Sequence, residues 1–153
     1  MKTLLVLLLL ILALLGSVQA QTQSPSPTPF PNLEGTWTGT GEGIRMDGST
    51  EKLNLNMVVD RQVGQLFVGA LQVDQLGAEG QVVNQEKLLF TGHLAGDLRI
   101  AMTLTPWPPP SEEPAGPAPT TALMNGTWAA DTISGVWENL TFGNTGWATL
   151  KKQ

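Results

Sequence analysis

The sequence predicts an all-β protein: an antiparallel, up-and-down meander of about eight strands that closes into a small barrel, with a β-sandwich as the alternative. Three observations lead to this prediction. From Leu33 onward, apolar and polar residues alternate, and no stretch shows the 3.6-residue period of an amphipathic helix. All eleven prolines fall between Pro25 and Pro31 or between Pro106 and Pro119. The segments between these stretches therefore keep every backbone N–H that a β-ladder needs.

Residues 1–20 have the parts of an export signal. Lys2 gives a positive start, Leu4 to Leu15 form an unbroken apolar run, and small residues precede a predicted cleavage site after Ala20. A helix of these twelve apolar residues spans about 18 Å, too short for a hydrocarbon core of about 30 Å. We therefore predict a removable signal peptide, no membrane span in the mature chain, and a secreted or periplasmic location.

The rest of the chain divides into a linker and one domain. Residues 21–32, QTQSPSPTPFPN, form a Ser/Thr/Pro-rich spacer that is predicted to be extended, because proline removes backbone donors. Residues 33–153 are predicted to form a single β-barrel domain, since a chain of this length is typical of one domain. The second proline stretch, residues 106–119, is predicted to be a long loop between two strands of that domain.

The strands follow from alternation that is interrupted by Gly, Asn and Asp. Leu53, Leu55 and Met57, for example, alternate with Asn54 and Asn56 and so give one apolar and one polar face. Segment 80–84 is short enough to merge with its neighbour, which makes the count eight or nine. The predicted strands are 35–42, 51–60, 65–74, 80–84, 86–94, 97–105, 121–129, 132–140 and 145–152.

Residue parity predicts how neighbouring strands pair. A two-residue turn at Ala130–Asp131 sets apolar residues and glycines opposite one another on one face. The predicted pairs are Trp128 with Ile133, Gly126 with Gly135, and Met124 with Trp137. A three-residue loop at 95–97 similarly predicts the pairs Leu94 with Leu98, Gly92 with Ile100, and Phe90 with Met102. The last hairpin, around residues 142–144, is ambiguous. A two-residue turn directs Trp147 away from the face of Trp137, whereas a turn with one more residue directs it to that face.

A meander with a single apolar face must close into a barrel or pack against a second sheet. An open sheet would expose that face to water and leave the backbone groups of its edge strands unpaired. Glycines recur inside the predicted strands, where they permit the bends and close approaches of a tightly curved barrel. These glycines are Gly39, Gly69, Gly92, Gly126, Gly135 and Gly146.

Two short motifs add a resemblance. Gly35-Thr36-Trp37 opens the first strand, and Gly146-x-x-Thr149-Leu150-Lys151 lies in the last one. With the meander between them, they resemble the small secreted barrels of the calycin group, which includes lipocalins, avidins and uncharacterised bacterial lipocalin-like domains. The resemblance covers about 120 residues. It implies an eight-stranded barrel that can hold one small ligand. It does not imply biotin binding, because avidins use a polar set that includes Tyr and this chain has none.

Composition excludes several functions. Without residues 1–20 the chain has 7 Lys and Arg against 13 Asp and Glu and no basic cluster, so nucleic-acid binding is not expected. Cysteine is absent, which excludes disulfides, thiol catalysis and thiolate metal sites. The single histidine, His93, is predicted to point into solvent, opposite to Phe90 and Leu94. With no nucleophile–base set and no metal-ligand spacing, neither an enzyme nor a cofactor or metal site is predicted.

The aromatic residues leave two functional hypotheses open. Trp128 and Trp137, with Trp37, Phe67, Phe90 and Met124, either line a cavity for a small, partly apolar ligand or simply fill the interior. The first hypothesis gives a non-enzymatic, exported binding barrel. The alternative is a structural or protein-interaction module, an inhibitor or envelope component, that acts through its loops. The loop at 106–119 is then a candidate for docking a protein partner, or is only a tolerated insertion.

Overall fold

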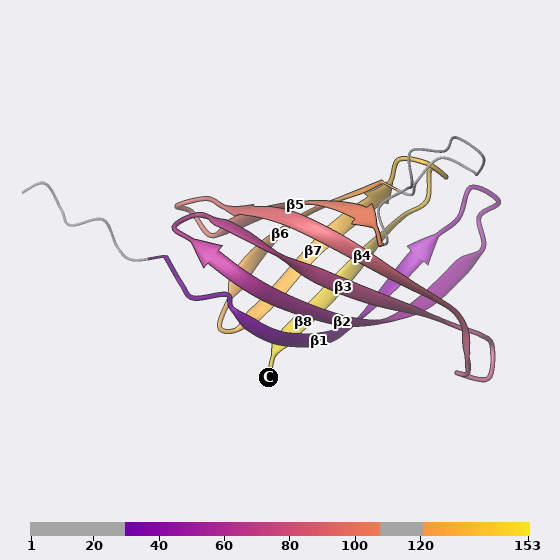
Figure 1. The fold of residues 1–153 in the computed structure, drawn as a ribbon. Coiled ribbons are helices and arrows are strands. Elements are labelled where there is room, and N and C mark those ends of the chain that lie inside the picture. The colour runs from indigo at the N-terminus through magenta and orange to yellow at the C-terminus, as the bar shows by residue number, and fades with distance from the viewer. Residues whose placement is uncertain (1–29, 108–120) are drawn as a thin grey trace, which may run out of the picture.

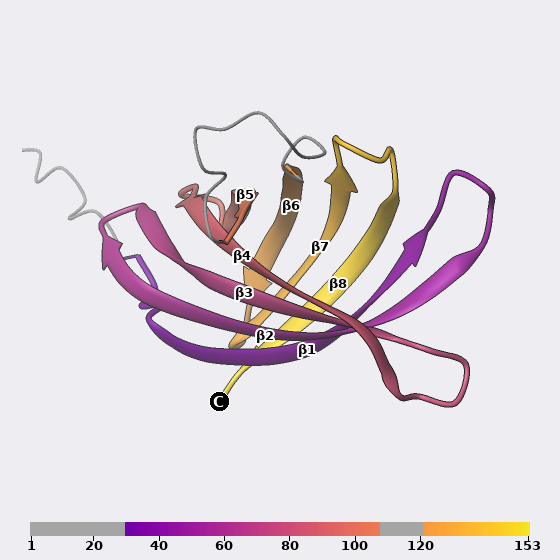
Figure 2. The ribbon, with the colours of Figure 1, turned by 45° about the vertical axis from the view of Figure 1, so that its right-hand side comes forward.

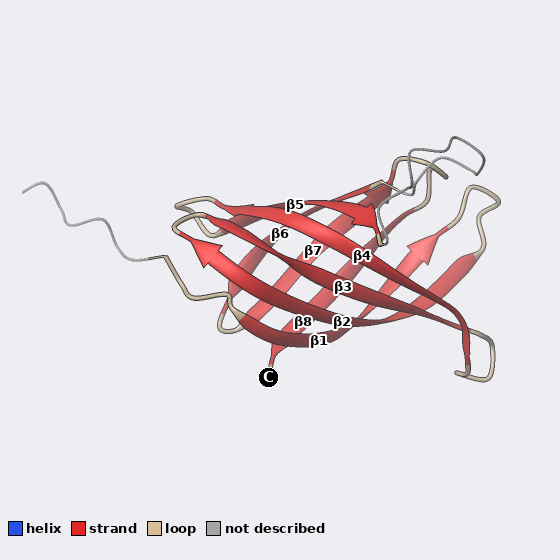
Figure 3. Cartoon of the chain, in the orientation of Figure 1, coloured by secondary structure: helices blue, strands red, loops and turns tan. Residues whose placement is uncertain are grey.

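Eight antiparallel strands make up the fold, as the sequence predicts (Figures 1 and 3). The structure is a computed structural model, and it describes residues 30–107 and 121–153. The segment predicted at 80–84 joins the following strand, so the count is eight. The strands are β1 (Gly35–Ile44), β2 (Thr50–Val63), β3 (Leu66–Leu76), β4 (Val82–Leu94), β5 (Arg99–Pro106), β6 (Ala122–Ala129), β7 (Thr132–Asn139) and β8 (Thr145–Lys152).

The sheet closes into a barrel because β1 pairs with β8 as well as with β2. Each strand otherwise pairs with its neighbours in the chain, which is the predicted meander and not the alternative β-sandwich. Closure pairs the first strand of the meander with the last, so that neither is left as a free edge of the sheet. No helix long and apolar enough to cross a membrane occurs in the part of the chain that the structure describes.

The pairing of β6 with β7 is the one predicted from parity. Trp128 faces Ile133, Gly126 faces Gly135, and Met124 faces Trp137. Ala130 and Asp131 between them both have positive φ, 46° and 60°, as a two-residue type I′ turn requires. This turn matches the right-handed twist of the flanking strands and fixes the register.

The predicted register of β4 with β5 is wrong by two residues. Phe90 faces Leu104 rather than Met102. The loop begins one residue later than predicted: Ala95 N–H donates to Arg99 O at 2.8 Å, and Leu98 N–H donates to Ala95 O at 2.9 Å. Leu98 has a φ of 65°, in the left-handed region that disfavours leucine, so this turn position could not be predicted from the residue type. A shift of two residues preserves parity, and the predicted inward face is therefore correct.

One end of the barrel, at the left in Figure 1, is closed by side chains of the segment that precedes β1. Leu33, which precedes β1, is completely buried there, and Phe30 packs against the core. Leu33 N–H donates to Gln62 Oε1 at 2.7 Å, and Trp37 Nε1 donates to Leu33 O at 2.8 Å. Lys152 at the end of β8 donates to Asn32 O and lies 5.7 Å from the Trp37 ring centroid. Part of the segment predicted as linker thus contacts the barrel.

The other end carries the β1–β2, β3–β4 and β7–β8 hairpins (Figures 1 and 2). The β7–β8 hairpin resolves the ambiguity of Trp147, which pairs with Val136 and points outward with 48% of its side chain exposed. The predicted signal peptide at 1–20, most of the linker at 21–32 and residues 108–119 of the Pro-rich loop lie outside the described residues.

Candidate functional site

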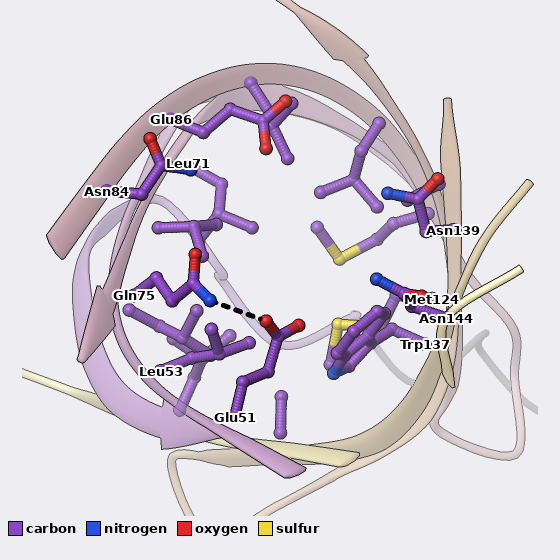
Figure 4. A pocket seen from close by; sticks show the side chains of 18 residues that line it. Glu51, Leu53, Leu71, Gln75, Asn84, Glu86, Met124, Trp137, Asn139 and Asn144 are labelled. Atoms are coloured by element: carbon purple, nitrogen blue, oxygen red, sulfur yellow. Dashed lines mark hydrogen bonds between the residues drawn. The ribbon is translucent and has the colours of Figure 1, made fainter. Parts of the chain in front are cut away.

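A cavity opens at the end of the barrel that carries the β1–β2, β3–β4 and β7–β8 hairpins (Figure 4). Its volume is about 130 Å³. Its walls are made by inward-facing apolar side chains from β2 to β8, which the alternating pattern directs into the interior. The apolar residues are Leu53, Leu55, Leu71, Val73, Leu88, Met102, Leu104, Ala122, Met124, Trp137, Ala148 and Leu150.

Polar side chains surround the mouth of this cavity (Figure 4). All of them except one residue in the β7–β8 hairpin continue the inward-facing row of their strand toward the open end. They lie one step of two residues beyond the last apolar residue or, for Asn84, two steps. An apolar pocket with a few polar groups at its entrance is the usual form of a small-molecule site. The polar residues are Glu51, Gln75, Asn84, Glu86, Asn139 and Asn144, the last of which lies in the hairpin.

Glu51 is the centre of a hydrogen-bond network at the mouth. Its Oε2 accepts from Arg45 Nη2 at 2.9 Å and Nε at 3.1 Å, and from Gln75 Nε2 at 2.9 Å. The Glu51 side chain is 12% exposed, whereas that of Arg45 is 42% exposed. The guanidinium therefore lies on the solvent side of the carboxylate. In Figure 4 the other carboxylate oxygen turns toward the open interior.

Trp137 forms one wall of the cavity, and its ring packs over Gly146 on the adjacent strand β8. A Cβ at Gly146 would lie 2.7 Å from Cε2 and Cζ2 of the Trp137 indole ring, so only glycine leaves room for this ring. The Nε1 of Trp137 is buried and has no hydrogen-bond partner among the described residues. Such an unsatisfied donor costs about 1–3 kcal/mol, which the apolar contacts of the ring must offset.

The structure places two of the six predicted site residues, Met124 and Trp137, at the cavity. Trp37, Phe67, Phe90 and Trp128 face inward as predicted, but they do not line it. They pack in the closed half, where the Phe67 and Phe90 rings meet edge to face with centroids 5.9 Å apart. Large aromatic side chains fill the interior of so narrow a barrel. The space that remains is in the half with smaller side chains.

Sequence reasoning missed the polar mouth. A signal was present: Glu51, Gln75 and Glu86 each have the parity of the buried apolar residues of their own strand. Inward-pointing polar residues at the same end of several strands indicate an open end, since a polar group in a packed core needs a partner. Without the strand register, these residues could not be assigned to one place.

Acidic side chains outnumber basic ones in the half of the barrel that contains the mouth. Among the described residues this half has seven carboxylates and three basic groups, a formal charge of −4. These are Glu42, Asp47, Glu51, Asp74, Glu79, Glu86 and Glu138 against Arg45, Lys52 and Lys87. The closed half balances Glu34, Asp60, Asp97 and Asp131 with Arg61, Arg99, Lys151 and Lys152. A mouth of one sign attracts ligands of the other.

The single histidine of the chain lies away from the cavity. His93 is exposed on the outer face, as predicted, where its Nε2 lies 3.3 Å from Gln65 Oε1. Within residues 30–107 and 121–153, no group of three or more His, Asp or Glu side chains could hold a metal ion. The cavity presents apolar walls, amides and carboxylates, which suit binding.

The fold and the cavity define a small antiparallel barrel whose sheet is closed and whose interior opens to solvent at one end. This is consistent with the calycin-like architecture that the sequence resembles. No protein-family model matches the chain, and no curated protein matches it either.

Proposed function

We propose that this protein is a non-enzymatic, exported binding barrel that takes a small, partly apolar ligand into the cavity at its open end. The observation that carries the proposal is the cavity itself, which has apolar walls, a polar mouth and access from solvent. A barrel with no ligand to hold would have a higher free energy of unfolding if side chains filled this space, because unfilled apolar volume costs about 24 cal/mol per Å³.

The cavity volume limits the size of the ligand. About 130 Å³ is close to the roughly 150 Å³ of an apolar cavity that accepts benzene. It is smaller than the roughly 300–1,000 Å³ that drug-sized ligands occupy. The cavity therefore holds a group of about six non-hydrogen atoms, the size of a benzene ring, and any further part of the ligand extends toward the mouth.

Export is the second part of the proposal and is supported by residues 1–20. N-terminal sequencing of the protein recovered from outside the cytoplasm should begin at Gln21. Retention of the full chain in the cytoplasm would contradict export without affecting the binding proposal.

A cavity-filling variant tests binding. Ala122 lines the cavity and is 8% exposed, so Ala122→Leu places three additional carbons in the binding space. The matched control is Ala101→Leu on the neighbouring strand β5, where residue 101 is exposed on the outer face. We would titrate small aromatic alcohols by calorimetry and by Trp fluorescence. Millimolar or tighter binding that is lost only in Ala122→Leu supports the proposal; no binding by the natural sequence contradicts it.

A second candidate function, protein interaction, is favoured by apolar residues on the outer face. Val136 and Trp147 are cross-strand partners that are 62% and 48% exposed, and Phe142 nearby in the β7–β8 hairpin is 52% exposed. Double substitution Val136→Thr and Trp147→Thr should abolish capture of a partner while the cavity still binds small ligands. The Pro-rich loop is a separate candidate for the same role, and deletion of residues 106–119 tests it.

A further inference from the structure

We infer that the ligand of the cavity carries a cationic head group, such as a primary amine, on a small apolar body. This inference rests on the proposed function and adds the chemical class of the ligand. It follows from the ionisable side chains that face the cavity and from their placement at its mouth.

Two carboxylates and no ammonium or guanidinium are among the described side chains that line the cavity. Glu51 and Glu86 extend into it from opposite sides (Figure 4). Gln75, Asn84, Asn139 and Asn144, which complete the mouth, are neutral amides that can donate or accept hydrogen bonds. Ionised carboxylates only accept, so the charged part of the mouth is complementary to donors.

Arg45 contacts only one of the two carboxylate oxygens of Glu51. Its guanidinium binds only Oε2, and Oε1 accepts no hydrogen bond from the described residues. The greater exposure of Arg45 places the positive charge outside the carboxylate, while Gln75 holds Oε2 from the next strand. Glu51 is thereby fixed with one oxygen directed to the interior, which is the arrangement that a cationic donor needs.

The distribution of charge over the two halves of the barrel also favours a cationic ligand. The open half of the described barrel has a formal charge of −4 and the closed half a charge of zero. Lys52 and Lys87, the other two cations of the open half, are exposed and have the outward parity of their strands; Lys87 lies over the Trp107 ring at 5.9 Å. A carboxylate ligand such as a fatty acid would approach and enter against this field.

Three matched probes test the inference: 2-phenylethylamine, 2-phenylethanol and phenylacetate, which share a phenyl ring and differ in the charge of the head group. We expect the amine to bind at least tenfold more tightly than the alcohol, and phenylacetate to bind most weakly. The preference for the amine over the alcohol should decrease as NaCl is raised, because salt screens charge pairs near the surface. This salt series uses the unmodified protein and needs no variant.

Charge-removing variants assign the preference to residues. Glu51→Gln and Glu86→Gln should each lower the amine-to-alcohol affinity ratio severalfold, and the double variant should bring it to about one. Glu138→Gln, an exposed acid at the same end of the barrel, is the matched control and should leave the ratio unchanged. Retained binding of 2-phenylethanol in each variant shows that the cavity is intact.

The outcomes separate the two proposals. If the alcohol binds and the amine binds no more tightly, or if phenylacetate binds most tightly, the cationic head group is wrong and the binding barrel stands. An amine preference that persists in the double variant also overturns the assignment to Glu51 and Glu86. Failure of all three probes to bind contradicts the proposed function itself.

Discussion

The indole ring of Trp137 on β7 occupies the space that a side chain at Gly43 on β1 would fill: a Cβ at residue 43 would lie 2.9 Å from Trp137 Cζ2. The same Cβ would lie 2.8 Å from Glu51 Oε1. Gly43 therefore sets the position of both an apolar wall of the cavity and the acidic group at its mouth.

Gly43→Ala should weaken ligand binding with only a small loss of stability. All three nearest atoms belong to the side chains of Glu51 and Trp137, which can shift, rather than to the backbone. Their displacement into the cavity should cost about tenfold in affinity for 2-phenylethanol, consistent with overpacking costs of about 1–3 kcal/mol. Calorimetry measures the affinity and Trp fluorescence reports movement of the ring. Unchanged affinity together with unchanged emission would show that the glycine has no such role.

Gly126 and Gly135 should tolerate alanine much less well. They face each other across β6 and β7, and a Cβ on either would meet the backbone carbonyl oxygen of Ser134 or Asn125. A backbone oxygen in a ladder cannot move aside without breaking hydrogen bonds, so each substitution should lower the free energy of unfolding by at least about 1–3 kcal/mol. Urea denaturation measures this loss. Gly96→Ala is the control, since a Cβ there meets nothing within 4 Å.

The architecture could be predicted because strand parity needs only the alternation of residue types. The pairs Gly126–Gly135 and Met124–Trp137 follow from a two-residue turn and apolar faces that coincide. The pairing of β4 with β5 could not be predicted as reliably, because the loop there has Leu98 at the left-handed position. The corresponding residues in the β1–β2 and β3–β4 loops are Gly48 and Gly80, each with a φ of 82°.

The candidate site was harder to predict than the fold. Parity assigns a side chain to the inside of the barrel, but it does not say which half of the interior is filled. Trp37 and Trp137 are both inward-facing tryptophans, yet the first closes one end beneath Leu33 and the second forms a cavity wall. The difference depends on which side chains meet from strands far apart in sequence, such as Gly43 and Trp137.

Leu33 should act as the plug of the closed end, although it precedes the first strand. Its side chain has no exposed surface, so Leu33→Ala should lower the free energy of unfolding by about 2–5 kcal/mol. The backbone hydrogen bonds of Leu33 with Gln62 and Trp37 do not involve its side chain and can remain. Leu66→Ala is the control, because Leu66 is 62% exposed and its truncation should have little effect. Equal stability losses in the two variants would show that the N-terminal segment does not seal the barrel.

The stability of the fold should depend on pH through Asp47, which lies in the β1–β2 turn at the mouth. The hydrogen bond that the Ser49 hydroxyl donates, at 2.6 Å, is the main cause that lowers the pKa of Asp47 below its usual value of 3.8, and Ser49 N–H adds to it at 2.9 Å. A carboxyl whose folded pKa is depressed stabilises the fold above the unfolded pKa, and this contribution is lost as pH falls through the folded pKa. Ser49→Ala removes the hydroxyl donor and should raise the pKa of Asp47 toward 3.8. Carboxyl NMR titration measures this change, and Asp97, in a different turn, should titrate identically in both proteins. An unchanged Asp47 titration in the variant would show that the hydroxyl does not bind the carboxylate in solution.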